Sequence, residues 1–152
     1  MRYVVGYMFS PDYREVALIR KAKPEWQRGK LNGVGGKIEI GERKGIAMSR
    51  EFAEEAGVII PEMSWLHIRT EFFSNTQESV RKQDSEAKIH HFAYKATYNE
   101  WSTCRTMEQE HILKVLVDDV ISGFCATLYN IPYLVCMARI LLQQPPENRP
   151  LP

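Results

Sequence analysis

The sequence has few cysteines and no long apolar run. Its 152 residues include only Cys104, Cys125 and Cys136, which are widely spaced and form no C-x-x-C pair. This pattern is typical of reduced thiols, and it argues against a disulfide framework or a zinc site. The apolar stretch that precedes residue 10 is too short for a signal sequence or a membrane span. We therefore expect a cytoplasmic protein that does not bind membranes.

An excess of charge of either sign is also missing. Lysine and arginine number 20 and aspartate and glutamate 19, so the formal net charge is +1. This balance argues against an extended nucleic-acid surface and favours small molecules as ligands. The hydrophobic fraction of 44% and the length of 152 residues suit one globular domain. We predict a single domain over residues 1–142 and a proline-rich, flexible tail over residues 143–152.

The most informative segment runs from Gly36 to Val58 and reads GKIEIGERKGIAMSREFAEEAGV. Its second half predicts a helix over residues 43–56, which places Glu51, Glu54 and Glu55 on one face. The other face, which we expect to be buried, carries Ile46, Ser49, Phe52, Ala53 and Ala56. Three carboxylates on one turn repel each other, and a bound Mg²⁺ would offset that repulsion. A solvated acidic face is the alternative.

Alternating and β-branched segments elsewhere predict strands with polar loops between them. The predicted strands cover residues 3–9, 15–20, 31–40, 65–73, 88–98 and 111–117, and polar loops cover residues 23–30 and 74–87. Apolar residues recur every three or four positions from Leu128 to Leu142, which predicts a helix with Asn130 as its N-cap. His90 and His91 are neighbours in one predicted strand and face opposite sides, so a two-histidine metal clamp is not expected.

The spacing of the acidic segment resembles the signature of the Nudix hydrolases, G-x5-E-x7-R-E-U-x-E-E-x-G-U, where U is a bulky apolar residue. All nine specified positions are filled, with Phe52 and Val58 at the two bulky ones. The resemblance implies hydrolysis of a nucleoside diphosphate linked to another group, with Mg²⁺ or Mn²⁺ as cofactor. It also implies an α+β fold, the Nudix-type α/β/α sandwich with a mixed β-sheet between helices.

Carried over to this chain, the resemblance assigns roles to the charged residues of the signature. Glu51, Glu54 and Glu55 would form the metal-binding face, and Glu51 or a neighbour would polarise the attacking water. Arg50 would orient Glu51 through an ion pair. Glu42 would support the loop or reach a second metal ion.

Two residues upstream of the helix would complete the implied phosphate site. Gly35 would help to hold the metal through its carbonyl, and Lys37 would contact phosphate; the alternative for Lys37 is an ordinary lysine at a strand end. Attack by metal-activated water needs no covalent intermediate. In agreement with this, the sequence contains neither G-x-S-x-G nor G-x-x-x-x-G-K-[ST].

The residues just before the helix suggest a substrate class. The stretch N-G-V-G-G-K-I-E at positions 32–39 resembles the MutT-like branch, which hydrolyses nucleoside triphosphates, including oxidised purine forms such as 8-oxo-dGTP. The resemblance implies that Asn32 reads a purine edge through its amide; a turn in which Asn32 bonds its own backbone is equally open. Trp26 would stack on a base or pack its loop down. Asn130, with Asp118 and Asp119, lies where relatives place base-reading side chains; a turn that ends a strand is the alternative for Asp118 and Asp119.

Marks of other Nudix branches are missing. There is no S-Q-P-W-P-F-P-x-S stretch, and residues 72–76, about sixteen positions after the signature, read Phe-Phe-Ser-Asn-Thr without the proline or tyrosine of other branches. We therefore expect cleavage of a nucleoside triphosphate to monophosphate and pyrophosphate. An ADP-ribose, dinucleoside polyphosphate or RNA-cap pyrophosphohydrolase is the first alternative. A non-catalytic nucleotide-binding module is the second, and a homodimer stays open as an assembly.

A further acid from outside the signature completes the site in many Nudix proteins. The candidates on flanking loops are Glu86, Glu100, Glu108 and Glu110. Glu110 is preferred because it immediately precedes a predicted strand. For each of the four, a solvated loop charge is the alternative.

Overall fold

The computed structural model, which describes residues 1–74 and 86–149, contains one mixed β-sheet. Its strands are β1 (Arg2–Phe9), β2 (Glu15–Arg20), β3 (Leu31–Asn32), β4 (Leu66–Ser74), β5 (Glu86–Lys95) and β6 (His111–Leu116). The strand order is β3-β2-β1-β5-β4, and β6 pairs with the opposite edge of β2. Strands β1 and β5 run parallel, whereas the other pairs are antiparallel. The predicted mixed sheet is therefore confirmed.

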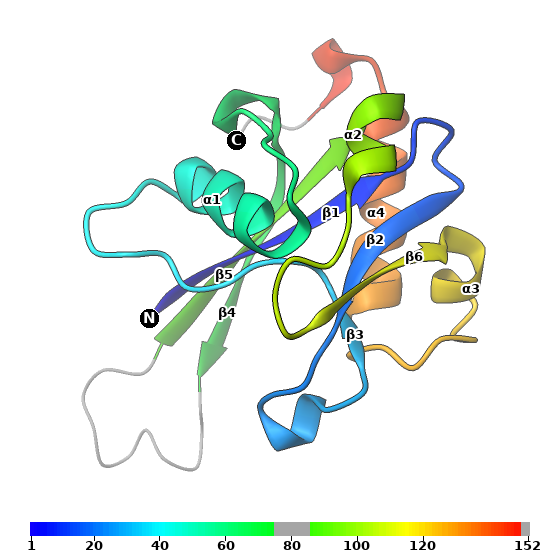
Figure 1. The fold of residues 1–152 in the computed structure, drawn as a ribbon. Coiled ribbons are helices and arrows are strands. Elements are labelled where there is room, and N and C mark those ends of the chain that lie inside the picture. Colours follow the sequence, from blue (N-terminus) through cyan, green and yellow to red (C-terminus); the bar gives the residue numbers. More distant parts are fainter. Residues whose placement is uncertain (75–85, 150–152) are drawn as a thin grey trace, which may run out of the picture.

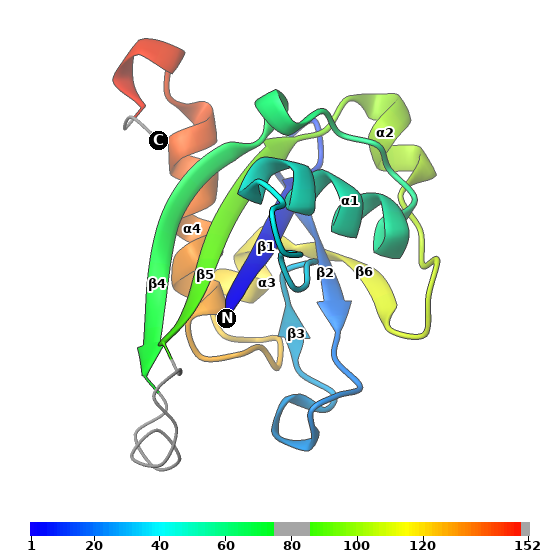
Figure 2. The same cartoon turned by 90° about the vertical axis from the view of Figure 1, so that its left-hand side faces the viewer.

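Helices cover both faces of this sheet. Helix α1 (Lys44–Ala56) lies on one face, and α4 (Ile131–Gln143) lies on the other (Figures 1 and 2). Helix α1 ends as predicted, because Gly57 adopts the left-handed conformation and its N–H bonds to the carbonyl of Ala53. The predicted α/β/α sandwich is confirmed. None of the helices in the described part of the chain combines the length and apolar character needed to span a bilayer.

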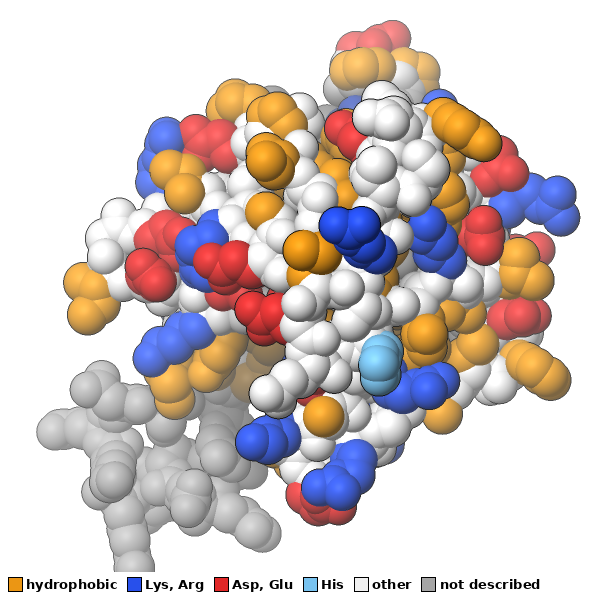
Figure 3. Space-filling view, in the orientation of Figure 1, with side chains coloured by type: hydrophobic (Ala, Val, Ile, Leu, Met, Phe, Trp, Pro, Cys, Tyr) orange, Lys and Arg blue, Asp and Glu red, His pale blue; other side chains and the backbone are white. Residues whose placement is uncertain are grey.

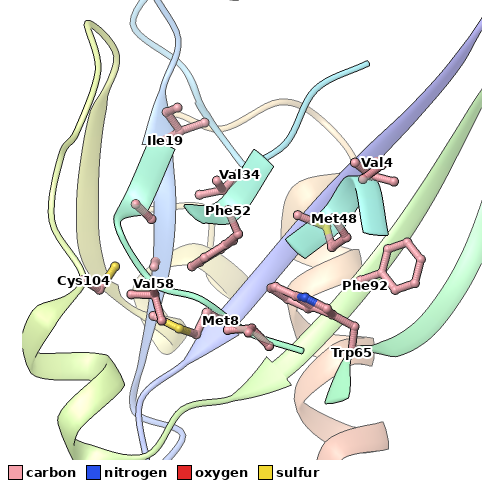
Figure 4. Packing of buried hydrophobic residues seen from close by; sticks show 14 of the residues in the cluster. Val4, Met8, Ile19, Val34, Met48, Phe52, Val58, Trp65, Phe92 and Cys104 are labelled. Carbon is pink, nitrogen blue, oxygen red and sulfur yellow. The ribbon is translucent and has the colours of Figure 1, made fainter. Parts of the chain in front are cut away.

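Strand β1 is buried on both faces and divides the core into two halves. Its even-numbered residues face α1, and its odd-numbered residues face α4, as the two-residue period of a strand requires. On the α1 side, Phe52 packs against Trp65 with ring centroids 5.2 Å apart, beside Met48 and Phe92 (Figure 4). On the α4 side, the largest buried side chain is Tyr7. Each helix is thus fixed to the sheet by its own apolar cluster.

The segment from Gly33 to Ile38, here called the β1 strap, runs antiparallel along the first half of β1. Hydrogen bonds join Gly6 and Val34 in both directions, at 2.7 and 3.0 Å. The approach is so close that a Cβ on Gly35 would lie 2.0 Å from the carbonyl oxygen of Val4. The predicted strand over 31–40 is therefore a two-residue β3 followed by this strap, and residues 39–43 join the strap to α1.

Two short helices lie where the sequence predicts strand ends or a turn. Helix α2 (Tyr98–Thr103) follows β5 because Thr97 and Glu100 form a capping box at its start. Helix α3 (Val117–Ile121) continues from β6 and contains Asp118 and Asp119. Three short 3-10 helices, η1 (Glu25–Gln27), η2 (Glu62–Ser64) and η3 (Pro146–Asn148), lie in the connections and near the C-terminus.

The buried face of α1 differs in detail from the prediction. Phe52 and Ala56 are buried as expected, but Ile46 is 40% exposed, and Met48 is buried instead. The acidic side of the helix is partly covered as well, because Glu51 lies against Gly36 of the β1 strap. The side chain of Glu51 is only 13% exposed.

Two predicted segments outside the strands and main helices remain, a loop and the C-terminal tail. The predicted loop over residues 74–87 lies mostly outside the described residues. Near the C-terminus, Arg149 donates hydrogen bonds to the carbonyls of Gln144 and Leu142, at 3.1 and 2.9 Å. The division into a domain at 1–142 and a tail at 143–152 stays a prediction.

Partly buried histidines on the α1 side of the sheet make stability sensitive to acid. The Thr70 hydroxyl lies 2.8 Å from Nδ1 of His90 and 3.2 Å from Nε2 of His67. Burial lowers the pKa of His67 to about 4, and it also lowers the pKa of His90, with Lys44 as a second cause in both cases. The histidine rings therefore stay neutral in the folded state at pH values at which the unfolded chain, with an ordinary histidine pKa of about 6.5, is already protonated.

We expect the free energy of unfolding to be lost progressively as the pH falls from 6.5 toward 4. The sign follows from the lowered pKa values, because the unfolded chain binds protons in this range before the folded chain does. Urea unfolding at several pH values measures the slope, and His67→Gln should flatten it. His111→Gln, at an exposed position on β6, is the control. Equal slopes in the wild type and in His67→Gln would contradict this account.

Candidate active site

The three signature glutamates lie on one side of α1 and differ in exposure. The side chain of Glu54 is 50% exposed, whereas that of Glu51 is only 13% exposed. Figure 3 shows acidic side chains gathered around α1 with basic side chains among them. Because Phe52 and Ala56 bury the other side of the helix, the acidic side is held in a fixed orientation. The predicted grouping of these carboxylates is what the structure contains.

Arg50 organises this face, and all five of its N–H donors are used. Its Nε and one terminal nitrogen bind the two oxygens of Glu42, at 2.9 and 3.0 Å. The other terminal nitrogen binds Glu51 at 2.8 Å and Glu54 at 3.1 Å. The fifth bond goes to the carbonyl of Lys37, at 3.1 Å. A planar guanidinium is suited to such a fork because its donors are rigidly placed.

Glu42 is committed to this arrangement. Its Oε2 also accepts the N–H of Glu39 at 2.9 Å, and its side chain is 11% exposed. The hydrogen bond from Arg50 lowers the pKa of Glu42, and the bond to Glu42 in turn raises the pKa of Arg50. The structure therefore gives Glu42 the predicted supporting role for the loop. Contact with a second metal ion stays a prediction.

Gly36, the first residue of the signature, makes room for Glu51. A Cβ at position 36 would lie 2.4 Å from Oε2 of Glu51. Burial raises the pKa of Glu51, although the hydrogen bond from Arg50 opposes this effect. The carboxylate is thus enclosed between the β1 strap and Arg50, and only glycine fits at its back.

Of the three, Glu55 has the carboxylate with a buried oxygen left for a ligand. Its Oε2 is buried and accepts no hydrogen bond from any residue that the structure describes. Burial raises the pKa of Glu55 to about 7, while the charge of Lys21 opposes the shift. A buried carboxylate oxygen without a partner is unfavourable unless a cation or a donor reaches it.

These donors fit a hard divalent cation. Carboxylate oxygens are the ligands that Mg²⁺ and Mn²⁺ prefer, and one of them lacks a partner. Within the described ranges, however, no three histidine, cysteine or carboxylate side chains are already gathered as metal ligands. Arg50 holds one oxygen each of Glu51 and Glu54, so each of these carboxylates keeps one oxygen that Arg50 does not bind.

A pocket of about 720 Å³ opens beside Glu55. It lies between the end of β2 and the segment that precedes β6. Its lining residues are Ile19, Lys21, Ala22, Lys23, Glu55, Met107, Glu108, Gln109 and Glu110. Glu55 therefore links the acidic face of α1 to a space large enough for a phosphate chain.

Comparison with known proteins identifies the family. Residues 1–117 match the NUDIX domain. The chain belongs to the NUDIX family. The predicted superfamily and its enzyme class, the Nudix pyrophosphohydrolases, are thereby confirmed. A comparison with curated protein sequences finds no match.

Solved structures share the Nudix fold at low sequence identity. The NUDIX domain of Shewanella oneidensis NrtR, complexed with ADP ribose, has a TM-score of 0.72 and 17% identity, with 94% of this chain and 88% of that chain covered. MutT from Methanosarcina mazei Go1 has a TM-score of 0.67 and 15% identity, with 95% and 96% covered. A Caenorhabditis elegans Ap4A hydrolase has a TM-score of 0.61 and 16% identity, with 93% and 96% covered. NrtR is also known in complex with a 27mer DNA.

Asn32 on β3 and Asn130 just before α4 are the two asparagines predicted to bind substrate. Backbone bonds join Leu31 to Ala126 and Leu128, which brings Asn32 near the start of α4. The Oδ1 of Asn32 accepts the N–H of Gly33 at 2.8 Å, as in the predicted turn. Its amide NH₂ is then the group left for a ligand.

Asn130 does not cap α4 with its side chain as predicted. Instead its NH₂ donates to Glu71 at 3.0 Å, and its amide oxygen is left as an acceptor. Glu71 also accepts from Nε2 of His91 at 3.2 Å, and Nδ1 of His91 lies 3.2 Å from the Tyr7 hydroxyl. Burial lowers the pKa of His91 and raises that of Tyr7. The chain of bonds satisfies polar groups inside an otherwise apolar cluster.

The other predicted ligand residues are placed as follows. The indole of Trp26 is 65% exposed on η1, and the Lys37 side chain is exposed on the β1 strap. Gly35 lies on the strap against Val4, and a contact of its carbonyl with metal stays a prediction. Asp118 is engaged with Arg139 on α4, at 3.1 Å, rather than with a ligand site.

The four candidates for a further acid have different surroundings. Glu100 closes the capping box of α2 and accepts from the Tyr94 hydroxyl, so it is a structural residue. The side chain of Glu86 lies outside the described residues. Glu108 and Glu110 both line the pocket beside Glu55, and Glu110 is paired with Lys21.

Sequence reasoning missed Lys21 and Glu71. Lys21 follows a predicted strand without any motif, and Glu71 lies inside another. The partners of both are distant in sequence, with Glu110 89 residues and Asn130 59 residues away. No local pattern gives such pairings.

We expect Arg50→Lys to lower the free energy of unfolding by about 1–3 kcal/mol, because a lysine keeps the charge but cannot fill the five bonds of the guanidinium fork. Arg43→Lys is the matched control. Arg43 is near the start of the same helix, makes one exposed ion pair with Glu62, and should change stability by less than about 1 kcal/mol. Urea denaturation measures both. Equal effects of the two substitutions would argue against an organising role for Arg50.

Proposed function

We propose that this Nudix protein hydrolyses nucleoside triphosphates, including 8-oxo-dGTP, to monophosphate and pyrophosphate, with Mg²⁺ or Mn²⁺ as cofactor. The observation that carries the proposal is the buried Oε2 of Glu55, which has no partner among the described residues and adjoins the pocket of about 720 Å³. An ion on this carboxylate would meet a phosphate chain in the pocket.

The signature residues would hold the ion, and the rest of the catalytic effect would come from how the reacting groups are positioned. Glu51, Glu54 and Glu55 are the metal ligands in this proposal, with the Gly35 carbonyl beside them. When bound, the ion would neutralise phosphate charge and lower the pKa of a water molecule. Arg50 keeps Glu51 in one orientation, since it binds Oε1 and leaves Oε2 behind Gly36. Catalysis then rests on positioning and electrostatics.

The two asparagines support a nucleotide as the substrate. Asn32 offers a donor and Asn130 an acceptor, because the other half of each amide is already bonded. A purine edge presents both acceptors and donors, so each of these amides has a complementary group there. Trp26, exposed on η1, is available for stacking on a base.

Two alternatives are weaker. Likeness to NrtR with ADP ribose and to an Ap4A hydrolase supports an ADP-ribose or dinucleotide substrate, but at 16–17% identity it concerns the fold alone. RNA-cap hydrolysis has no feature of its own in the described residues. A non-catalytic module is disfavoured because every charged residue of the signature is present.

We expect Glu54→Gln to reduce kcat for Mg²⁺-dependent pyrophosphate release by more than about a hundredfold, because it removes one anionic ligand from the site. Glu54 is half exposed, so the fold should be kept and the melting temperature should change little. Glu39→Gln, which changes an exposed carboxylate outside the helix, is the control. A Glu54→Gln variant as active as the control would rule out the assigned role.

A substrate panel tests the substrate class. Wild-type protein is compared on dGTP, 8-oxo-dGTP, ADP-ribose and a dinucleoside polyphosphate by kcat/KM. A triphosphate should lead by about tenfold or more, since the pocket and the asparagine pair are complementary to it. A clear lead for ADP-ribose would replace the proposed substrate, and no hydrolysis of any compound would leave the non-catalytic module as the better description.

A further inference from the structure

The carboxylate of Glu110 accepts hydrogen bonds from three donors just after the end of β2. Its Oε2 accepts from the ammonium of Lys21 at 2.5 Å. Its Oε1 accepts from the backbone N–H of Ala22 at 2.5 Å and from that of Lys23 at 3.2 Å. The side chains of Glu110 and Lys21 are 18% and 19% exposed. Charge-assisted bonds of this kind are short and strong.

Glu110 and Glu55 therefore differ in what they offer to an ion. Both line the same pocket. Both oxygens of Glu110 are occupied, whereas Oε2 of Glu55 is buried without a partner in the described residues. An ion that enters the pocket would therefore bind Glu55 on α1, whereas Glu110 holds the backbone of Ala22 and Lys23.

Lys21 lines the same pocket as these two carboxylates. Ile19 and Lys21 both line the pocket, as the two-residue period along the end of β2 requires. The charge of Lys21 is also felt at Glu55, where it opposes the rise in pKa. A lysine has a long flexible stem, so a fixed partner is needed to keep its ammonium at one place.

We propose that Glu110 is a positioning residue that holds Lys21 and the backbone of residues 21–23 against the pocket, so that Lys21 binds the phosphate chain of the substrate. The inference rests on the proposed function. One of the three N–H donors of the Lys21 ammonium goes to Glu110, and two are left for phosphate oxygens. Glu110 is not a metal ligand in this arrangement, in contrast to the role that the resemblance suggests for it.

The experiment compares Glu110→Gln, Lys21→Met and the double variant with the wild type. Glutamine keeps an acceptor for the amides of residues 22 and 23 but loses the charge that holds Lys21. Glu147→Gln is the control, because Glu147 is an exposed carboxylate on η3 and does not line the pocket. The measurements are KM and kcat for dGTP, Mn²⁺ affinity by electron paramagnetic resonance, and pyrophosphate affinity by calorimetry with Mn²⁺ present.

We expect Glu110→Gln and Lys21→Met each to raise KM for dGTP and weaken pyrophosphate binding by about tenfold, with Mn²⁺ affinity unchanged. The double variant should bind pyrophosphate no more weakly than Lys21→Met does, because both changes remove the same contact. Glu147→Gln should resemble the wild type.

Three results would overturn the inference. Loss of Mn²⁺ affinity in Glu110→Gln would make Glu110 a metal ligand. If the changes in KM of the two single variants multiplied in the double variant, Glu110 and Lys21 would act independently. An unchanged KM in Glu110→Gln would show that Glu110 has no positioning role. Failure of the proposed function is a different outcome, since the wild type would then hydrolyse no triphosphate. In that case pyrophosphate binding alone decides whether Glu110 positions Lys21.

Discussion

The site depends on one guanidinium. Arg50 binds Glu42, Glu51 and Glu54 at once, and its fifth donor reaches the carbonyl of Lys37 on the β1 strap. It therefore neutralises the repulsion among the acids and also ties the strap to the helix. Only a planar group with five donors does both, since an ammonium has three donors and no fixed plane. The acidic face is stable before any cation is bound because this charge is built into it.

The glycines of the β1 strap turn that charge arrangement into a site. At Gly35 the backbone touches β1, and at Gly36 the space that a Cβ would fill is taken by the carboxylate of Glu51. A strap with side chains at these positions would push the helix away from the sheet. The close packing thus explains why Glu51 is withdrawn from water while Glu54, one turn further along the same helix, stays half exposed.

The sequence predicts those parts of the site that are local. The helix, its carboxylates, Arg50 and Gly57 lie within one continuous segment, and their mutual geometry follows from helical spacing alone. The Nudix family and the sandwich follow from the same segment. By contrast, the periodicity of the helix does not predict that Met48 is buried and Ile46 exposed, because the side of α1 that meets the sheet is decided by tertiary packing. The sequence patterns also do not predict the short helices α2 and α3, because their signals are a single capping box and a five-residue turn.

Substrate recognition is the part that sequence patterns reach least, and the reason is physical. An asparagine offers a donor and an acceptor, and which of the two faces a ligand depends on what binds the other half. For Asn32 the partner is the adjacent Gly33. For Asn130 it is Glu71 on another strand, itself fixed by the buried His91. The same holds for Lys21, whose ammonium is directed by Glu110. The proposed metal ligands thus lie on one helix, whereas the side chains proposed to select the substrate depend on contacts between segments that only the fold brings together.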